Sequence, residues 1–197
     1  MARQSIIFIS GNKEKHREFR QILGKMGIGV VCRDVDIDEI QDPDEEAVAS
    51  RKARDAFAII QAPVVVEDTG LHISAMNGYP GNLVKHFFAS LEAEGIIRFL
   101  RGKNRDAQAV TAIAYCNQNG PRVFRGELRG SISERVRGES GFHWDFVFIP
   151  EGCNETFAEM GSAAKNRISQ RRKALEMFAA WFRSRGPLQQ GGSALKS

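Results

Sequence analysis

The sequence predicts an α/β fold with a mixed sheet. The apolar stretch Ile6 to Ile9 precedes a polar turn and an amphipathic helix, and a later helix leads into the β-branched run Val64 to Val66. Such alternation of strands and helices favours parallel pairing. Residues 107–115 and 122–136 instead alternate like the two strands of a hairpin around Asn117 to Gly120. The sequence therefore predicts one sheet that contains both parallel and antiparallel pairs of strands.

The first two helices have clear boundaries. The first ends near Gly27, and a strand is expected from Val30 to Arg33. The second begins at the acidic segment Asp42 to Glu46, which supplies a cap, a proline for the first turn and carboxylates that suit the helix dipole. It should run to about Ile60.

The second half of the chain contains two further predicted helices. One covers residues 83–100, and the last runs from about Asn166 to Arg185, after a strand at Phe146 to Ile149. We expect residues 1–186 to form one domain and residues 187–197, rich in Gln, Gly and Ser, to form a flexible tail.

The composition is that of an ordinary globular protein. Hydrophobic residues make up 42% and charged residues 26%, which excludes a disordered or fibrous chain. Its three cysteines are too few and too scattered for a disulfide framework or a zinc site. The apolar stretch at the start is too short for a membrane span. We therefore expect a cytoplasmic protein without a membrane partner.

The net charge of +4 is modest, although basic residues gather between positions 165 and 185. A solvated helix face explains this cluster, as does a local anionic ligand. A nucleic-acid-binding module is the third alternative, but it usually shows a denser basic stripe. We expect no stable nucleic-acid partner.

An acidic pair follows the strand at Val64 to Val66. Glu67 and Asp68 are expected in a loop at the strand end, where they can address one metal ion and one water. Carboxylate oxygens suit Mg²⁺, and Glu39 is a candidate further ligand. The pair would equally serve to cap a turn.

Two other segments offer contacts for a nucleotide. Ser10, Gly11, Asn12 and Lys15 lie at a predicted helix start, where backbone N–H groups attract phosphate, although helix capping is an equally simple role. Lys85 is either a second phosphate contact or a surface lysine.

An aromatic loop, Gly141 to Asp145, precedes the strand at Phe146. Phe142 and Trp144 can stack on a base or pack in the core, and Asp145 can accept from a purine N–H. Hydrogen-bond donors near the last helix, including Arg171, can reach a purine carbonyl or face solvent.

Taken together, these motifs resemble the inosine triphosphate pyrophosphatase family from Ile6 to about Phe182. The resemblance rests on Ser10 to Lys15, on Val66 to Leu71 with Asn77 to Gly81, and on Phe142 to Pro150 with Thr156 to Met160 and Lys165 to Ser169. It implies an elongated fold of two lobes around a central cleft, usually assembled as a homodimer. It also implies magnesium-dependent hydrolysis of ITP, dITP and XTP to monophosphate and pyrophosphate, with Mn²⁺ as a substitute ion.

The resemblance also assigns roles to residues. It implies catalytic roles for Asp68, Glu67 and Lys15 and metal binding by Glu39, Glu67 and Asp68. It implies substrate contacts by Ser10, Gly11, Asn12, Lys15, Thr69, Lys85, Phe142, Trp144, Asp145, Lys165, Ser169, Gln170 and Arg171.

Three residues depart from the family pattern. His143 stands where the family normally has glycine, Phe146 where it has proline, and Gln170 where it has histidine. A glutamine amide can donate to a carbonyl but cannot become a cation. A catalytically altered nucleotide-binding or regulatory protein of the same fold is therefore the alternative to an enzyme.

Overall fold

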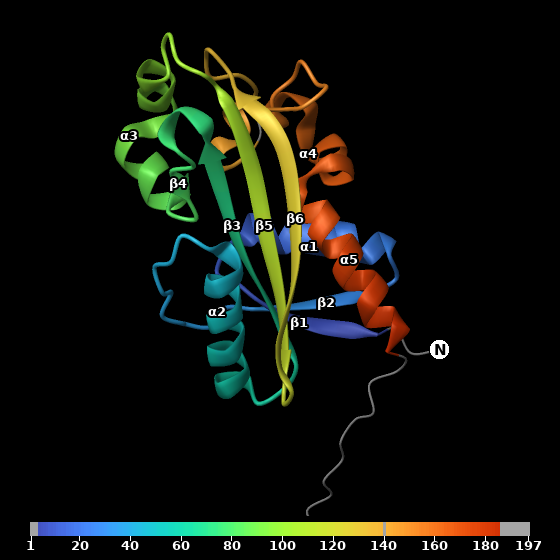
Figure 1. Cartoon of the computed structure of the whole chain (residues 1–197). Helices are drawn as coiled ribbons and strands as arrows, with labels where there is room; N and C mark the ends of the chain where they lie inside the picture. Colours follow the sequence, from blue (N-terminus) through green and yellow to red (C-terminus); the bar gives the residue numbers. More distant parts are fainter. Residues whose placement is uncertain (1–3, 140, 186–197) are drawn as a thin grey trace, which may run out of the picture.

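The structure is a computed structural model that describes residues 4–139 and 141–185. Its centre is one seven-stranded sheet in the order β2-β1-β3-β5-β6-β7, with β4 paired to β3 (Figure 1). Strand β1 is parallel to β2 and β3, and all other pairs are antiparallel. The predicted mixed sheet is confirmed. The strands are β1 Ser5–Ile9, β2 Gly29–Arg33, β3 Val64–Ile73, β4 Pro80–Gly81, β5 Asp106–Asn117, β6 Gly120–Ile132 and β7 Phe148–Pro150.

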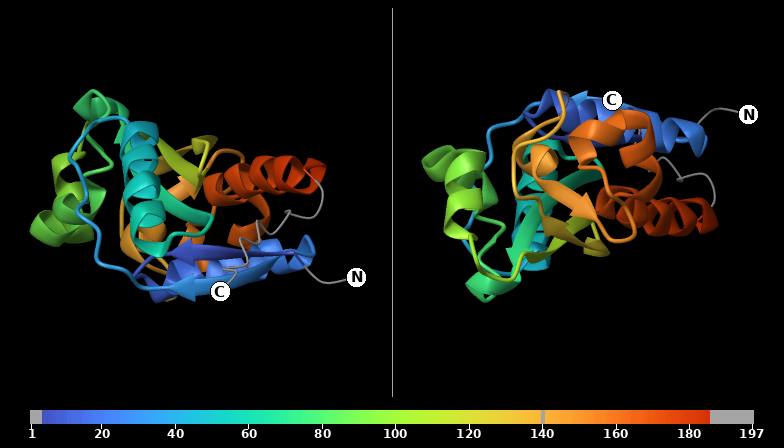
Figure 2. Two further views of the ribbon diagram at one scale, coloured as in Figure 1. Left: turned by 90° about the horizontal axis from the view of Figure 1, so that it is seen from below. Right: turned by 90° about the horizontal axis from the view of Figure 1, so that it is seen from above.

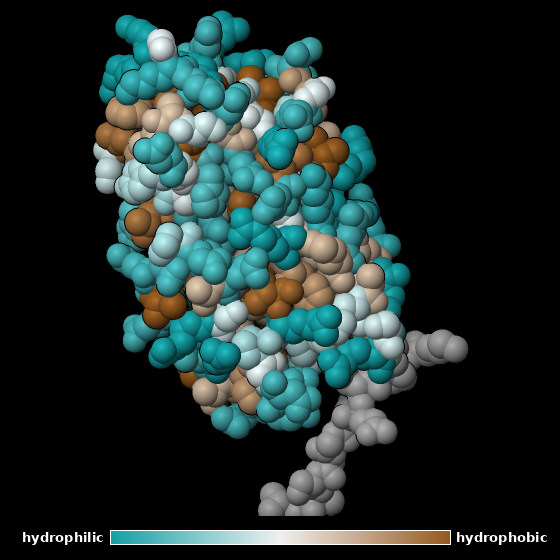
Figure 3. Space-filling model, viewed as in Figure 1, coloured by the Kyte–Doolittle hydropathy of each residue, from teal (hydrophilic) through white to brown (hydrophobic). Residues whose placement is uncertain are grey.

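In the described part of the chain, five α-helices and two short 3-10 helices flank this sheet (Figure 2). They are α1 Lys13–Lys25, α2 Glu45–Ile60, α3 Val84–Phe99, α4 Phe157–Ile168 and α5 Gln170–Ser184, with η1 Ser74–Met76 and η2 His143–Phe146. No helix among residues 4–139 and 141–185 is both long and apolar enough to cross a membrane. On the face drawn in Figure 3, apolar side chains lie in small groups between hydrophilic ones.

Side chains alternate between the two sheet faces, so each long strand contributes to more than one apolar cluster. On one face, Val65 and Ile113 pack with α1 and α5, and Leu71 and Ala109 pack farther along with α3, η2 and α4. On the other face, Val66 packs with α2. The polar residues of β3 occupy the gap between the first two clusters.

The acidic pair does not lie in a loop, as predicted. Strand β3 continues through Glu67 and Asp68 to Ile73, because both partner strands, β5 and β4, extend beyond the apolar run. The apolar run Val64 to Val66 covers only the start of this strand, because polar residues of β3 are buried as well. The two carboxylates therefore point to opposite faces of the sheet.

Two predicted elements in the C-terminal half are also divided differently. The segment predicted as one last helix contains the end of α4 and all of α5, with Ser169 extended at φ −59° and ψ 157° between them. The predicted strand at Phe146 begins only at Phe148, because η2 takes up the preceding residues. The tail at 187–197 lies outside the described residues, and the two-lobe cleft stays a prediction.

Candidate active site

The site forms where β1 ends and β3 continues. Strand β1 pairs with β3 only at Val64 and Val65, so the edge of β3 beyond these residues faces the loop that leads from β1 into α1. The side chains of Glu67 and Asp68 project from β3 at this point. The carboxyl ends of parallel strands commonly form binding crevices, because the chain turns away there.

Glu67 is buried and enclosed by cations. Arg171 donates to both of its oxygens, from Nε at 2.6 Å and from Nη2 at 2.7 Å. Lys15 Nζ lies 3.0 Å from Oε1. Burial alone would raise the pKa of Glu67, but the charges of Arg171 and Lys15 outweigh it and lower the pKa to about 2. Glu67 is therefore a permanent carboxylate.

The cations beside Glu67 belong to a larger buried network. Glu18 accepts from Arg171 Nη1 and lies 2.9 Å from Lys165 Nζ. Lys165 also donates to Asp145 at 2.6 Å. Three carboxylates thus face three cations, which compensates for burying charge in this gap between apolar clusters.

Sequence reasoning missed Glu18. It is buried on α1 although acidic side chains usually face solvent. The available signal was its position, three residues after Lys15 and four before Ile22, on the apolar stripe of a helix. A carboxylate on such a stripe indicates a buried partner.

Asp68 lies in the opposite environment. Its Oδ2 atom is buried and has no hydrogen-bond partner among the residues that the structure describes. Burial raises the pKa of Asp68 to about 7, despite the opposing charges of Lys15 and Lys52 and with support from the charges of Glu39 and Glu45. This carboxyl can exchange a proton near neutral pH.

Gly70 leaves room for the carboxylate of Glu45 against this face of β3. A Cβ atom added at Gly70 would lie 2.2 Å from a carboxylate oxygen of Glu45 and 2.8 Å from the backbone of Gly81. Glu45 is itself held by His72, at 2.5 Å. The glycine of the acidic motif is therefore required by close packing.

The three predicted metal ligands do not gather around one point. Glu39 contacts Lys52, and both oxygens of Glu67 are engaged by Arg171. Within residues 4–139 and 141–185, no group of three or more His, Cys, Asp or Glu side chains is placed to hold a metal. Asp68 and Glu39 nevertheless act on each other electrostatically.

The predicted phosphate turn lies beside these carboxylates. Asn12 caps α1 by accepting from the N–H groups of Glu14 at 2.9 Å and Lys15 at 3.2 Å. Ser10 and Gly11 line a hollow of about 450 Å³ together with Asp34, Val35, Asp36, Ile37, Glu39, Lys52 and Ile9. Lys85 is exposed in the first turn of α3, and its charge acts on Glu39.

The aromatic loop and the α4–α5 junction lie at the other end of the network. Lys165 Nζ is 4.3 Å from the centre of the Phe142 ring, on one face of it. Trp144 is buried in the apolar cluster with α3, yet its Nε1 has no hydrogen-bond partner within the described chain.

Two other predicted contacts, Ser169 and Thr69, have structural roles in this arrangement, whereas a third, Gln170, has a buried atom without a partner among the described residues. Ser169 caps α5 by accepting from Arg172 N. Thr69 donates to the carbonyl of Val110 at 2.7 Å. Gln170 is buried, and its Oε1 finds no partner in the part of the chain described.

The fold and the site define a class of protein: an α/β protein with a buried network of alternating charges at the end of a parallel strand, next to a carboxyl that titrates near pH 7. Residues 6–181 match the Ham1 family model. The chain therefore belongs to the Ham1 family.

Similar proteins cover nearly the whole chain. A protein of Methanopyrus kandleri named dITP/XTP pyrophosphatase is 44% identical over 91% of this chain and 96% of its own length. One of Yarrowia lipolytica named inosine triphosphate pyrophosphatase is 42% identical over 90% and 95%. The solved structure of a HAM1 protein from Coxiella burnetii superposes with a TM-score of 0.81 at 26% identity, covering 92% of this chain and 99% of that one. The recognised family and the mixed α/β fold are thus confirmed.

Proposed function

We propose that this protein hydrolyses non-canonical purine nucleoside triphosphates, ITP, dITP and XTP, to the monophosphate and pyrophosphate. Membership of a family with relatives named for this activity supports the proposal. The observation that carries it is the juxtaposition of Asp68, a carboxyl with a pKa of about 7, with Lys15, whose charge acts on Asp68 and which also pairs with Glu67.

The reaction needs a water and charge compensation. Asp68 takes a proton from the water while the oxygen of that water attacks the α-phosphorus. The bond between the α-phosphorus and the oxygen that bridges it to the β-phosphate then breaks, which releases pyrophosphate. Lys15 and Lys85 balance charge on the leaving group. Glu67 remains ionised and holds Lys15 and Arg171 in position.

The network around Phe142 suits a purine base. Three of the five N–H groups of Arg171 donate to Glu67 and Glu18, which leaves further donors for a purine O6. Adenine carries an amino group at that position and would leave such donors unpaired. A 6-oxopurine is therefore the favoured base.

Magnesium dependence is part of the proposal, with Mn²⁺ as a substitute. Asp68 fits a divalent cation, because its buried Oδ2 is an oxygen ligand without a hydrogen bond from the described residues. Glu39 is the candidate second ligand, whereas Glu67 fits only after Arg171 and Lys15 release it. A bound cation would polarise phosphate oxygens and lower the pKa of water.

A panel of triphosphates with magnesium tests the proposal. We expect pyrophosphate release from ITP, dITP and XTP at a kcat/KM at least ~100-fold above that for ATP, since buried donors reject an amino group strongly. Gln170→His should raise the preference for ITP, because an imidazolium is a stronger donor to a carbonyl than an amide. Tight ITP binding without pyrophosphate release would favour the nucleotide-binding alternative.

We further propose a homodimer that acts in the cytoplasm. The described cysteines are all free, which suits a reducing compartment.

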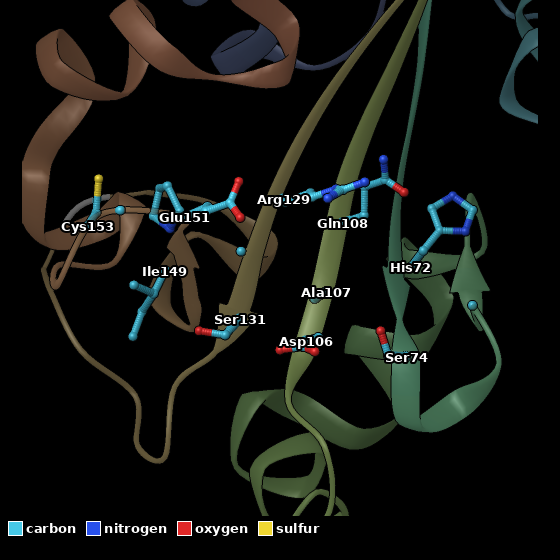
Figure 4. A pocket seen from close by; sticks show the side chains of 14 residues that line it. His72, Ser74, Asp106, Ala107, Gln108, Arg129, Ser131, Ile149, Glu151 and Cys153 are labelled. Carbon is cyan, nitrogen blue, oxygen red and sulfur yellow. The ribbon is translucent and has the colours of Figure 1, made fainter.

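For the dimer contact we propose the sheet face beyond α2, which is uncovered and forms a hollow of about 620 Å³ (Figure 4). His72, Gln108 and Arg129 form one row across three strands there. Light scattering should give twice the chain mass. Arg129→Glu should weaken the dimer, whereas the matched change Arg98→Glu, at an exposed residue of α3, should not.

A further inference from the structure

His143 adopts a backbone conformation that favours glycine. Its φ of 51° lies in the left-handed region, which residues other than glycine enter infrequently, although histidine, asparagine and aspartate do so more often than the rest. Such conformations carry a conformational cost and persist where the surroundings impose them, often in binding sites. The loop nevertheless places an imidazole at this position.

The ring of His143 has no hydrogen-bond partner that accounts for this placement. It lies between its neighbours, with its centre 5.1 Å from that of Phe142 and 5.9 Å from that of Trp144. Its Nδ1 is buried and receives or donates no hydrogen bond within the described chain. A buried nitrogen without a partner is costly, so a ligand atom is its natural complement.

Cations surround this ring. Burial and the charges of Lys15 and Lys85, followed by those of Arg171 and Lys165, together lower the pKa of His143 to about 4. The imidazole is therefore neutral at pH 7, with one N–H donor. Lys15 and Lys85, whose charges act on the ring most, are also the proposed phosphate contacts, so the ring is within electrostatic range of these lysines while it packs beside Phe142.

We propose that His143 is a substrate-contacting residue that donates a hydrogen bond from its ring to an oxygen of the polyphosphate chain. The inference rests on the proposed function and adds a contact to it. A phosphate oxygen is an acceptor, and a neutral ring N–H would add a directed donor to the two ammonium charges of Lys15 and Lys85.

Calorimetric titration of the purified protein with inorganic pyrophosphate tests the contact without turnover. We expect His143→Gly to bind pyrophosphate about 10-fold more weakly, because it loses the donor while its backbone is relaxed. His143→Asn tolerates the same φ and keeps an N–H donor, so its affinity should stay within about 3-fold of wild type. Thermal midpoints should not fall in either variant.

Two results would overturn the proposal. One is unchanged pyrophosphate affinity in His143→Gly. The other is a change confined to the ratio of kcat/KM for ITP and ATP, which would place the ring at the base instead. Absence of pyrophosphate release from ITP by the wild type would contradict the proposed function alone, because the titration with pyrophosphate does not depend on hydrolysis.

Discussion

Glu67 and Asp68 are adjacent on one strand, yet their carboxyl groups have opposite properties. Glu67 faces Arg171 and Lys15 and has a pKa of about 2, whereas Asp68 faces the α2 side and has a pKa of about 7. Glu67 is buried and Asp68 is half-buried, so burial, which raises the pKa of a carboxyl group, does not explain why Glu67 has the lower pKa. The difference lies in hydrogen-bonded cations, which Glu67 has and Asp68 lacks among the described residues. The alternation of a β-strand thus separates a carboxylate held in ion pairs from a carboxyl that can exchange a proton near neutral pH.

The largest expected effect is on catalysis at Asp68. Replacing it with Asn keeps the size of the side chain but removes the proton acceptor, so we expect kcat for ITP to fall by about 1,000-fold or more while the fold is retained. Steady-state pyrophosphate release and circular dichroism measure both properties. The matched control is Asp106→Asn, at the exposed end of β5, which should retain full activity. Near-normal turnover in Asp68→Asn would remove this residue from the catalytic role.

The next effect is on stability at Glu67. Glu67→Gln leaves Arg171 buried with only Glu18 as a charged partner, so we expect a loss of about 3–5 kcal/mol in the free energy of unfolding. Urea titration at pH 7 measures it. Glu127→Gln removes one of the three acidic partners of Arg125 in a more exposed cluster of ion pairs, and its expected cost is below about 1 kcal/mol. Equal costs for the two variants would show that the buried network does not stabilise the fold.

The contrast between the two carboxylates also marks what sequence can predict. The hairpin around Asn117 to Gly120 depends on local turn chemistry, and its pairing was confirmed. The second helix was also confirmed, but Asp44 caps it and Pro43 lies before its first turn, not in it as predicted. The environment of Glu67 depends on Arg171, which is 104 residues away, and no local pattern encodes that pairing. The motif brought attention to the acidic pair, but its placement in a loop was wrong because β3 buries polar residues as well as apolar ones.

The smallest expected effect is a pH dependence of the free energy of unfolding that arises from Asp68. Its pKa is raised from 3.8 to about 7 in the folded protein, so between pH 4 and 7 the folded state holds a proton that the unfolded state has released. Stability due to this group is therefore present below pH 4 and lost as the pH rises through 7. The full shift corresponds to about 4 kcal/mol, and partial exposure of the side chain reduces our expectation to about 2 kcal/mol.

Asp68→Asn should remove this loss. Urea titrations in a chelating buffer should show the variant becoming more stable than wild type as the pH rises from 4 to 7, with a constant difference above about pH 8. Glu67 does not interfere, because its pKa is lowered to about 2 and its contribution is lost only as the pH falls below about 4. A difference between variant and wild type that is independent of pH would mean that Asp68 is ionised throughout, and the two neighbouring carboxylates would then be alike in charge and differ only in their contacts.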